Sequence, residues 1–264
     1  MKKISKNIYM AVVFIFLYAP IGVLILNSFN ASKSRTVWTG FTLDWYKKLF
    51  TNDLIISSLI NTLIIAVIAT VISTVLGTAA AIGISGMKRF TRSLIIDITY
   101  MPILNPEIVT GVSLMLLFVA MKLDFGYVSL VLAHITFCVP YVILNVLPKL
   151  RQMDSSLYDA AMDLGCNPAK AMIKVVIPEI MPGIITGALM SFTYSIDDFV
   201  VSYFTHGASA QPLSITIYSM TRRKVSPEIN ALSAIIFVVV LLVLLIMNIH
   251  DINAEKKSRK EQRL

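Results

Sequence analysis

Acidic side chains occupy otherwise apolar stretches of this sequence: Asp97, Glu107, Asp197 and Asp198, with no Lys or Arg in the same stretches. An ionised carboxylate at the centre of a membrane-spanning helix costs roughly 2.5–3.5 kcal/mol on insertion scales. Protonation, water, a cation on a partner subunit or a cationic substrate must compensate for it. The sign of these charges favours a path for a cation, because an anion transporter places Arg, Lys or bare helix N-termini at that depth.

Glu107 follows Pro102 and the pair Asn105-Pro106, which interrupt the third apolar stretch. Freed backbone groups at membrane depth are tolerated only beside protein or water, so we expect this stretch to line an inner cavity. Glu107 then has two interpretations that can hold together. It caps the restarted helix, whose N-terminus favours an anion, or it binds a travelling cation.

Asp198 lies on a polar stripe within the fifth apolar stretch, at the helical spacing of three and four residues. The other members of the stripe are Ser191, Tyr194, Ser195 and Ser202. Asp197 is turned about 100° away from it, so we expect Asp197 to be structural and Asp198 to face the path. Asp97 lies near the end of its stretch, within reach of Arg89 or Arg92. We interpret His134 as a hydrogen-bonded packing residue.

Motifs for catalysis are missing from the sequence. It has no nucleotide-binding glycine loop followed by Lys, no His-Glu-x-x-His and no Gly-x-Ser-x-Gly. Adjacent acids such as Asp197 and Asp198 diverge on a helix and do not readily share a proton. Cys138 and Cys166 lie in different kinds of segment and have no neighbours suited to a metal. We therefore expect a chain that is not an enzyme, holds no metal or cofactor, and takes its energy from nucleotide bound by another chain.

Composition defines the elements that must position these residues. The 264 residues are 56% hydrophobic with a mean hydropathy of +0.77, which is typical of an all-α polytopic membrane protein. A helix needs about 20 apolar residues to cross the bilayer. The sequence predicts one transmembrane domain, residues 1–264, with six spans near 8–27, 58–84, 94–120, 127–148, 183–204 and 230–250.

Basic residues predict the orientation. Fifteen of the 23 Lys and Arg residues lie at the termini or in the loops that share their side of the membrane, including the segment 151–182. By the positive-inside rule, both termini and this segment are cytoplasmic. Membrane orientation accounts for the net charge of +8 without nucleic acid.

The segment 151–182 is a polar island with the pattern of two short helices joined by a tight turn. Ser156 and Asp159 have capping-box spacing, and Gly165 falls where a left-handed C-cap is needed. Asn167-Pro168 starts a second helix, which Pro178 and Pro182 are expected to end.

This segment resembles the signature loop of permease subunits of bacterial ABC importers: Glu-Ala-Ala, three residues, Gly, nine residues, Ile, one residue, Leu-Pro. Here the corresponding residues are Asp159, Ala160, Ala161, Gly165, Val175, Ile177 and Pro178. The resemblance implies that Asp159, Ala160, Ala161, Gly165, Pro168 and Pro178 belong to a coupling loop that docks into a cleft on a separate ATPase subunit.

The whole chain is similar to the second permease of spermidine/putrescine importers, through the strings at 27–30, 134–140, 191–198 and 226–232. The resemblance implies a type I importer architecture in a bacterial inner (plasma) membrane. It also implies a heterodimer with a homologous permease, two ATP-binding subunits that hold ATP and magnesium, and an extracytoplasmic polyamine-binding protein. Glu107 and Asp198 would then meet the ammonium groups, Tyr194 would add a cation–π contact worth ~0.5–2 kcal/mol, and Ser191 and Ser195 would complete the path.

Alternatives remain open. A channel or a substrate-free energy-coupling subunit is one, although the coupling loop argues against a channel. The other is an importer permease for a different small cationic or polar solute, such as an amino-acid derivative, thiamine or iron(III).

Overall fold

The computed structural model describes residues 2–32, 37–154, 156–223, 227–238 and 241. Within these residues the chain is helical and contains no β-strand, only the isolated bridges Asn30–Phe41 and Gly207–Ala210. The chain divides into two compact units: residues 1–56 with 217–264, and residues 57–216. Each unit is considered by itself.

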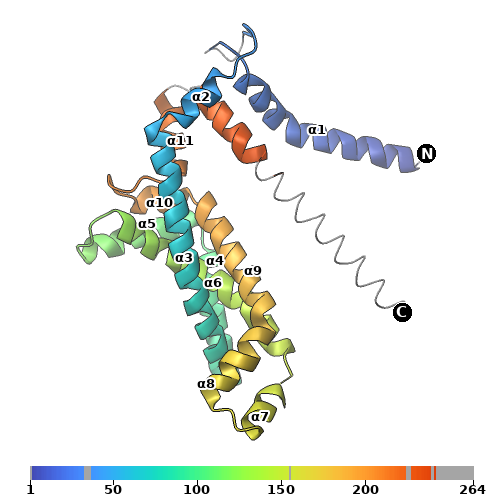
Figure 1. Cartoon of the computed structure of the whole chain (residues 1–264), viewed down its shortest axis with the longest axis vertical. Coiled ribbons are helices and arrows are strands. Elements are labelled where there is room, and N and C mark those ends of the chain that lie inside the picture. Colours follow the sequence, from blue (N-terminus) through green and yellow to red (C-terminus); the bar gives the residue numbers. More distant parts are fainter. Residues whose placement is uncertain (1, 33–36, 155, 224–226, 239–240, 242–264) are drawn as a thin grey trace. The chain divides into compact units, whose positions relative to one another are not determined.

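The first unit contains α1 (Lys2–Ser28) and α2 (Asp44–Phe50), and α3 (Asp53–Ser85) begins in it (Figure 1). Trp45 is buried, and its indole N–H donates a hydrogen bond of 2.7 Å to the carbonyl of Asn30. The Asn30 side chain accepts hydrogen bonds from the N–H groups of Ser32 and Thr39. The connection between α1 and α2 is therefore held by polar groups of its own residues. After α11 (Leu213–Arg223), a short apolar helix covers Pro227–Val238.

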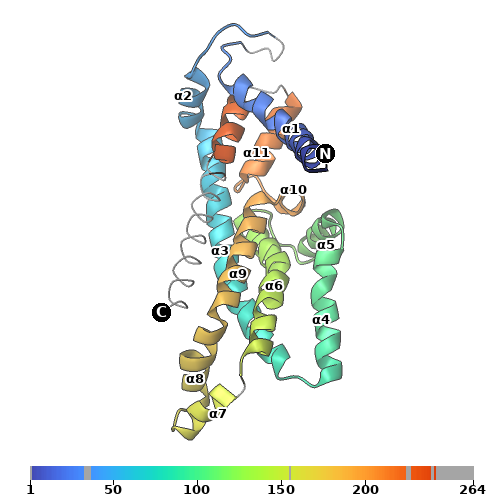
Figure 2. The same ribbon diagram turned by 90° about the vertical axis from the view of Figure 1, so that its right-hand side faces the viewer.

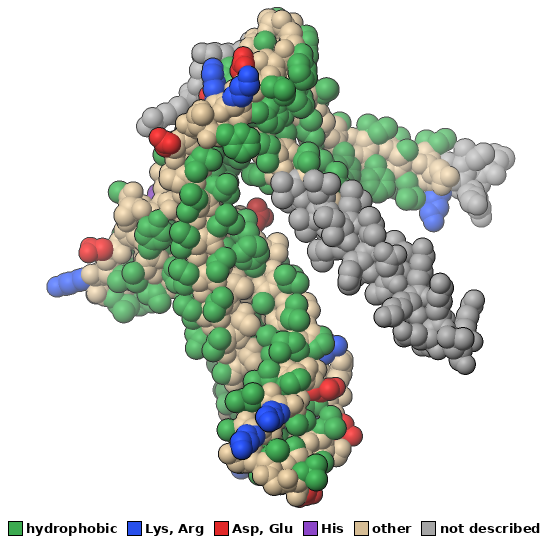
Figure 3. All heavy atoms as spheres, in the orientation of Figure 1, with side chains coloured by type: hydrophobic (Ala, Val, Ile, Leu, Met, Phe, Trp, Pro, Cys, Tyr) green, Lys and Arg blue, Asp and Glu red, His purple; other side chains and the backbone are tan. Residues whose placement is uncertain are grey.

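The second unit is built around α6 (Tyr127–Gln152), which packs along α9 (Ile177–Asp197) and against α4 (Arg89–Leu104) (Figure 2). Its largest core cluster joins Ala81 and Ile84 of α3, Val142 and Val146 of α6, and Ile180 of α9. On the face in Figure 3, hydrophobic side chains cover α3, while charged side chains of this unit gather near α7 and α8 and at the tip beyond α5. A long apolar surface is what lipid contact requires.

Glycines set the distance between α6 and α9. A Cβ on Gly183 would lie 2.8 Å from the carbonyl oxygen of Asn145, and one on Gly187 would lie 3.0 Å from the Cα of Val142. The Gly183-x-x-x-Gly187 spacing thus permits backbone contact between the two helices, as small residues do in membrane bundles.

Helices of membrane-spanning length agree with the predicted spans in three places. Lys6–Ser28, Asp53–Ser85 and Tyr127–Gln152 cover the spans predicted near 8–27, 58–84 and 127–148. The predicted span 94–120 is not one helix: α4 and α5 (Glu107–Ala120) meet at an angle of 101°, as expected of X-Pro at Asn105-Pro106, which disfavours helix. Pro102, also expected to interrupt this span, lies inside α4.

The predicted span 183–204 does not coincide with one helix. The helical run starts earlier, at Pro168, and ends at Asp197; α10 (Val200–Thr205) follows as a separate short helix. Of the sixth predicted span, 230–250, residues 239–240 and 242–250 lie outside the described part of the chain.

Candidate functional site

Two helix breaks meet at one cavity of the second unit. The first separates α4 from α5 at Asn105-Pro106, and the second separates α9 from α10 at Asp198-Phe199. Asp198 has extended backbone angles, φ −62° and ψ 126°, so the α9 helix cannot continue through it. Each break places the first turn of a short helix beside the cavity, with Glu107 opening α5 and Asp198 preceding α10.

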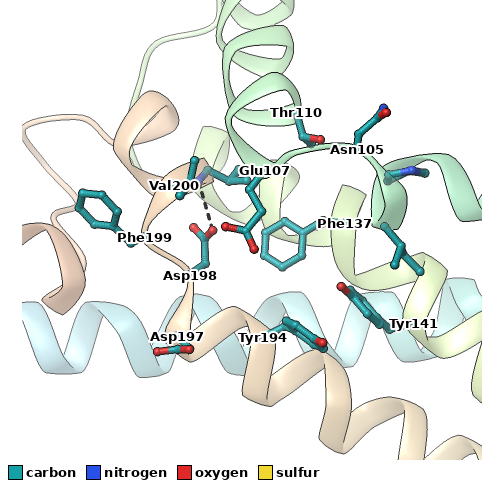
Figure 4. A pocket seen from close by; sticks show the side chains of 13 residues that line it. Asn105, Glu107, Thr110, Phe137, Tyr141, Tyr194, Asp197, Asp198, Phe199 and Val200 are labelled. Carbon is teal, nitrogen blue, oxygen red and sulfur yellow. Dashed lines mark hydrogen bonds between the residues drawn. The ribbon is translucent and has the colours of Figure 1, made fainter.

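The cavity has a volume of about 230 Å³ and is lined by residues from α4, α5, α6, α9 and α10 (Figure 4). Its polar lining residues are Asn105, Glu107, Thr110, Asp197 and Asp198, together with the phenol groups of Tyr141 and Tyr194; Pro102, Ile103, Phe137, Phe199, Val200 and Val201 complete the wall. None of these lining residues is basic. Three carboxyl groups and several aromatic rings are the chemistry that binds organic cations.

Glu107 and Asp198 face each other across this cavity, whereas the Asp197 carboxyl group points elsewhere (Figure 4). Glu107 is exposed in the first turn of α5. The Asp198 side chain is only 7% exposed. Its carboxylate accepts hydrogen bonds from the backbone N–H groups of Val201 at 3.1 Å and Ser202 at 2.7 Å. Asp198 therefore caps the N-terminus of α10, a role that the predicted continuous helix did not include.

His134 joins the two sides of the second break. Its Nδ1 lies 2.7 Å from Ser195 Oγ on α9, and its Nε2 lies 3.1 Å from Ser202 Oγ on α10. The same Nε2 is 3.7 Å from a carboxylate oxygen of Asp198. The interpretation of His134 as a hydrogen-bonded packing residue is confirmed, and its position shows what it packs: the junction that holds Asp198.

The polar stripe predicted on the fifth span is divided by this break. Ser191 and Ser195 are buried against α6, where Ser191 Oγ donates to the carbonyl of Cys138 at 3.3 Å, and neither lines the cavity. Tyr194 does line it, stacked on Tyr141 with ring centroids 4.2 Å apart. Asp197, which we expected to be structural, also lines the cavity. Ser191 and Ser195 precede the break and miss the cavity because their side of α9 packs on α6 and His134. The break itself separates Ser202, on α10, from the residues of α9.

Sequence reasoning missed Phe137, Tyr141 and Phe199 as cavity residues. Their aromatic side chains on apolar segments carry no signal that separates a cavity wall from lipid or core. Only Phe137 stood in a string already noted for its likeness to a known family, residues 134–140, and Tyr141 follows that string directly.

The polar segment 151–182 forms a second candidate surface. α7 (Ser156–Asp163) starts where the Asp154 carboxylate accepts the N–H of Ser156 at 3.0 Å, and this hydrogen bond holds the pKa of Asp154 below its usual value. Asp154, rather than the predicted pair Ser156 and Asp159, thus supplies the carboxylate hydrogen bond at the start of α7.

The tight turn after α7 is a Schellman motif. Gly165 has φ +84°, Cys166 N–H donates to the carbonyl of Ala161, and Gly165 N–H donates to that of Met162. Asn167 then caps α8 (Pro168–Ala171) by accepting the N–H of Lys170 at 2.8 Å. The predicted left-handed glycine and the predicted restart at Asn167-Pro168 are both confirmed.

The prediction that Pro178 and Pro182 end this second helix is wrong. α8 continues through a π-helical turn (Met172–Val176) into α9, and Pro178 and Pro182 lie inside the continuous run. In the wide turn, Ile177 N–H reaches back to the carbonyl of Met172. A proline ring clashes with the carbonyl four residues earlier, and a π-bulge is one way in which a helix accommodates such a conflict.

Comparison with known proteins agrees with this arrangement. Residues 73–259 match the family described as "Binding-protein-dependent transport system inner membrane component". The permease PotC of the spermidine/putrescine transport system of Haemophilus influenzae is 36% identical over 233 residues, covering 88% of this chain and 91% of that protein. The permease PotI of the putrescine transport system of Escherichia coli K12 is 40% identical, covering 84% and 82%.

Solved structures share the fold at low identity. A bacterial ABC transporter involved in alginate import matches with a TM-score of 0.71 at 15% identity, covering 94% of each chain. An amino acid ABC transporter matches with a TM-score of 0.53 at 21% identity, covering 78% of this chain.

The chain is thus a membrane-embedded transport subunit of the ABC importer class. It belongs to the binding-protein-dependent transport system inner membrane component family.

Proposed function

We propose that this chain is the permease subunit of an ATP-driven polyamine importer and forms half of the translocation path for spermidine or putrescine. The similarity to PotC and PotI over most of the chain supports the substrate class. The observation that carries the proposal is the cavity whose lining includes Glu107, Asp197 and Asp198 and no basic residue. A polyamine carries ammonium groups separated by methylenes, so carboxylates and aromatic rings in one cavity match it chemically.

In this proposal Glu107 and Asp198 bind the ammonium groups, and Tyr194, stacked on Tyr141, provides a ring face for the chain of methylenes. Ser191 and Ser195 act indirectly, because they hold α9 against α6 and His134. Asp197 lines the wall of the cavity, but its carboxyl group points away from Glu107 and Asp198 (Figure 4). The alternative, a permease for another small cationic or polar solute, requires the same cavity with different selectivity.

The proposed assembly and topology follow the family. The full chain, 1–264, forms one transmembrane domain with six spans and both termini in the cytoplasm. It pairs with a homologous second permease, two ATP-binding subunits and an extracytoplasmic polyamine-binding protein in the bacterial inner membrane. The loop 151–182 is the coupling surface, through Asp159, Ala160, Ala161, Gly165, Pro168 and Pro178. The chain binds no ATP, and the purified chain alone is expected to hydrolyse none.

The test is polyamine uptake by proteoliposomes that contain the complete importer, with Glu107→Gln and Asp198→Asn compared at equal abundance. Hydrogen bonds to charged groups are worth about 1.5–3 kcal/mol, so each variant should lose roughly 10- to 140-fold in uptake efficiency at 1.4 kcal/mol per factor of ten. Asn is as good an N-cap as Asp, so Asp198→Asn preserves the start of α10. Asp124→Asn, an exposed acid outside the cavity, is the matched control.

The binding protein's own affinity for polyamine should stay unchanged in all variants, because that site is on another chain. Normal uptake by both Glu107→Gln and Asp198→Asn would disprove the cation-path assignment. Uptake of a neutral solute in preference to spermidine and putrescine by the wild type would favour the alternative substrate class.

A further inference from the structure

A second cavity of the same unit opens where α3 ends, α4 begins and α6 ends. Its volume is about 810 Å³, and three of its lining residues are arginines: Arg89 and Arg92 from the first turn of α4, and Arg151 from the end of α6. About sixty residues of chain separate Arg92 from Arg151, so the packing of α4 on α6 brings them together (Figure 2). We refer to the space bounded by these three residues as the arginine cavity.

The three positive charges have no acidic counterpart in the described part of the chain. No lining residue of the arginine cavity is acidic, and no carboxylate of a described residue lies within the 4.0 Å salt-bridge distance of any of the three guanidinium groups. The pairing of Asp97 with Arg89 or Arg92, expected from sequence, does not occur among these residues. Arg92 Nε is buried and has no hydrogen-bond partner. The rest of Arg92 is half-buried, and Arg89 and Arg151 are exposed. A buried donor left unpaired is costly, and an anion in the cavity would pair this nitrogen.

The start of α4 adds to the positive potential. α4 has sixteen residues, its N-cap residue Lys88 makes no side-chain capping bond, and its first turn contains no acid. The uncapped N–H groups and the helix dipole therefore favour an anion at this end. Ser93 lines the same cavity and can supply a hydroxyl donor, whereas the Ser85 hydroxyl already donates to the carbonyl of Ile82 at 2.7 Å.

We propose that the arginine cavity binds the phosphate of an anionic membrane phospholipid. The cavity lies at the ends of apolar helices of membrane-spanning length, the depth at which headgroups reside. Arginine presents planar paired donors that fit a phosphate in two-point contacts, and basic pockets between helices at this depth bind anionic headgroups. Ile96 and Leu150 continue the wall with apolar surface, which suits the glycerol and upper acyl portion of a lipid better than a free anion.

The proposal rests on the membrane location of the family and not on which solute is transported. The experiment uses the full chain in detergent micelles and measures retained lipid by native mass spectrometry with equal amounts of phosphatidylglycerol and phosphatidylethanolamine. Each basic residue near an anionic headgroup contributes about a fivefold factor. The double variant Arg89→Gln with Arg92→Gln should therefore lose roughly 25-fold in phosphatidylglycerol affinity. Lys47→Gln with Lys122→Gln, which removes two exposed charges elsewhere, should retain the wild-type value.

Two further measurements make the outcome decisive. Arg92→Lys keeps the charge but loses two-point contact, so it should bind phosphatidylglycerol more weakly than wild type and more strongly than the double variant. It also gives a result if the double variant does not fold. Inorganic phosphate at millimolar concentration should not displace the lipid. The proposal is overturned by equal retention of the two lipids, by equal loss in the Arg and Lys double variants, by wild-type affinity in Arg92→Lys, or by displacement of the lipid with inorganic phosphate.

Discussion

Gly165 offers a test in which the contribution of the backbone can be separated from that of contacts. Its φ of +84° is in the left-handed region, and a Cβ placed there would have nothing within 4 Å. Steric contact within the chain therefore contributes nothing to the effect of Gly165→Ala. What remains is backbone strain, which for an L-residue in this region is roughly 1–2 kcal/mol, or a factor of about 5–30 in the population of the turn.

Asn and Asp provide matched comparisons, because both tolerate the left-handed region better than Ala. They have nearly the same shape and differ in charge. We expect Gly165→Ala to lower the thermal stability of the purified chain and Gly165→Asn and Gly165→Asp to lower it less. The measurement is the unfolding temperature of the three variants and the wild type in one detergent.

Docking on an ATPase subunit makes a different prediction for the same three variants. A side chain at this open bend occupies space that a docked partner would need, so Gly165→Asn and Gly165→Asp should reduce uptake per ATP hydrolysed in the complete importer, at normal membrane abundance. An Ala variant as stable as the wild type would refute the strain argument. Normal coupling in both the Asn and Asp variants would refute the docking role of Gly165.

The remaining predictions concern stability, which is measured for each variant as the unfolding temperature in detergent and compared with that of the wild type. Gly183→Ala should destabilise the protein by about 1–3 kcal/mol, because its Cβ meets a backbone carbonyl at 2.8 Å. Gly83→Ala is the control, because the space around Gly83 is open, and it should be neutral or stabilising. Equal effects of the two substitutions would contradict the close-packing argument. His134→Ala removes two interhelical hydrogen bonds, each worth about 0.6–1.7 kcal/mol in membrane proteins, and unchanged stability would show that the junction does not depend on them. Trp45→Phe should lower the free energy of unfolding by about 0.5–1.5 kcal/mol, because it removes the indole hydrogen bond to Asn30. Stability equal to that of the wild type would mean that this hydrogen bond makes no net contribution.

Local signals in the sequence were sufficient for the loop after α6. Gly165 takes the left-handed conformation and Asn167-Pro168 starts a helix because both effects depend on the residue itself and its immediate neighbours. The same holds for the break at Asn105-Pro106, where a proline acts on the residue before it. Pro178 misled the same reasoning, because a π-helical turn of five residues on its N-terminal side gives the ring room.

The break at Asp198-Phe199 could not be predicted, because neither residue is a glycine or a proline. Its determinants lie elsewhere in the chain. Ser214 Oγ donates to the Asp198 carbonyl at 2.9 Å, and His134 links α9 and α10 from the opposite side. A carbonyl that would have been used by a continuing helix is thus satisfied by a side chain sixteen residues away. Hydrophobic periodicity contains no information about such a contact, and for that reason the polar stripe was drawn straight through the break.

The two breaks also explain why a few side chains decide the sign of the charge that the cavity accepts. A helix N-terminus carries about half a positive charge, and both α5 and α10 begin at the cavity. Bare N-termini in this arrangement would favour an anion. Glu107 in the first turn of α5 and Asp198 at the start of α10 place a full negative charge on each when they are ionised, which more than offsets the dipoles. The backbone therefore supplies a polar cavity, whereas the preference for a cation depends on the carboxyl groups of Glu107 and Asp198, and removal of either one shifts the balance toward the helix dipoles.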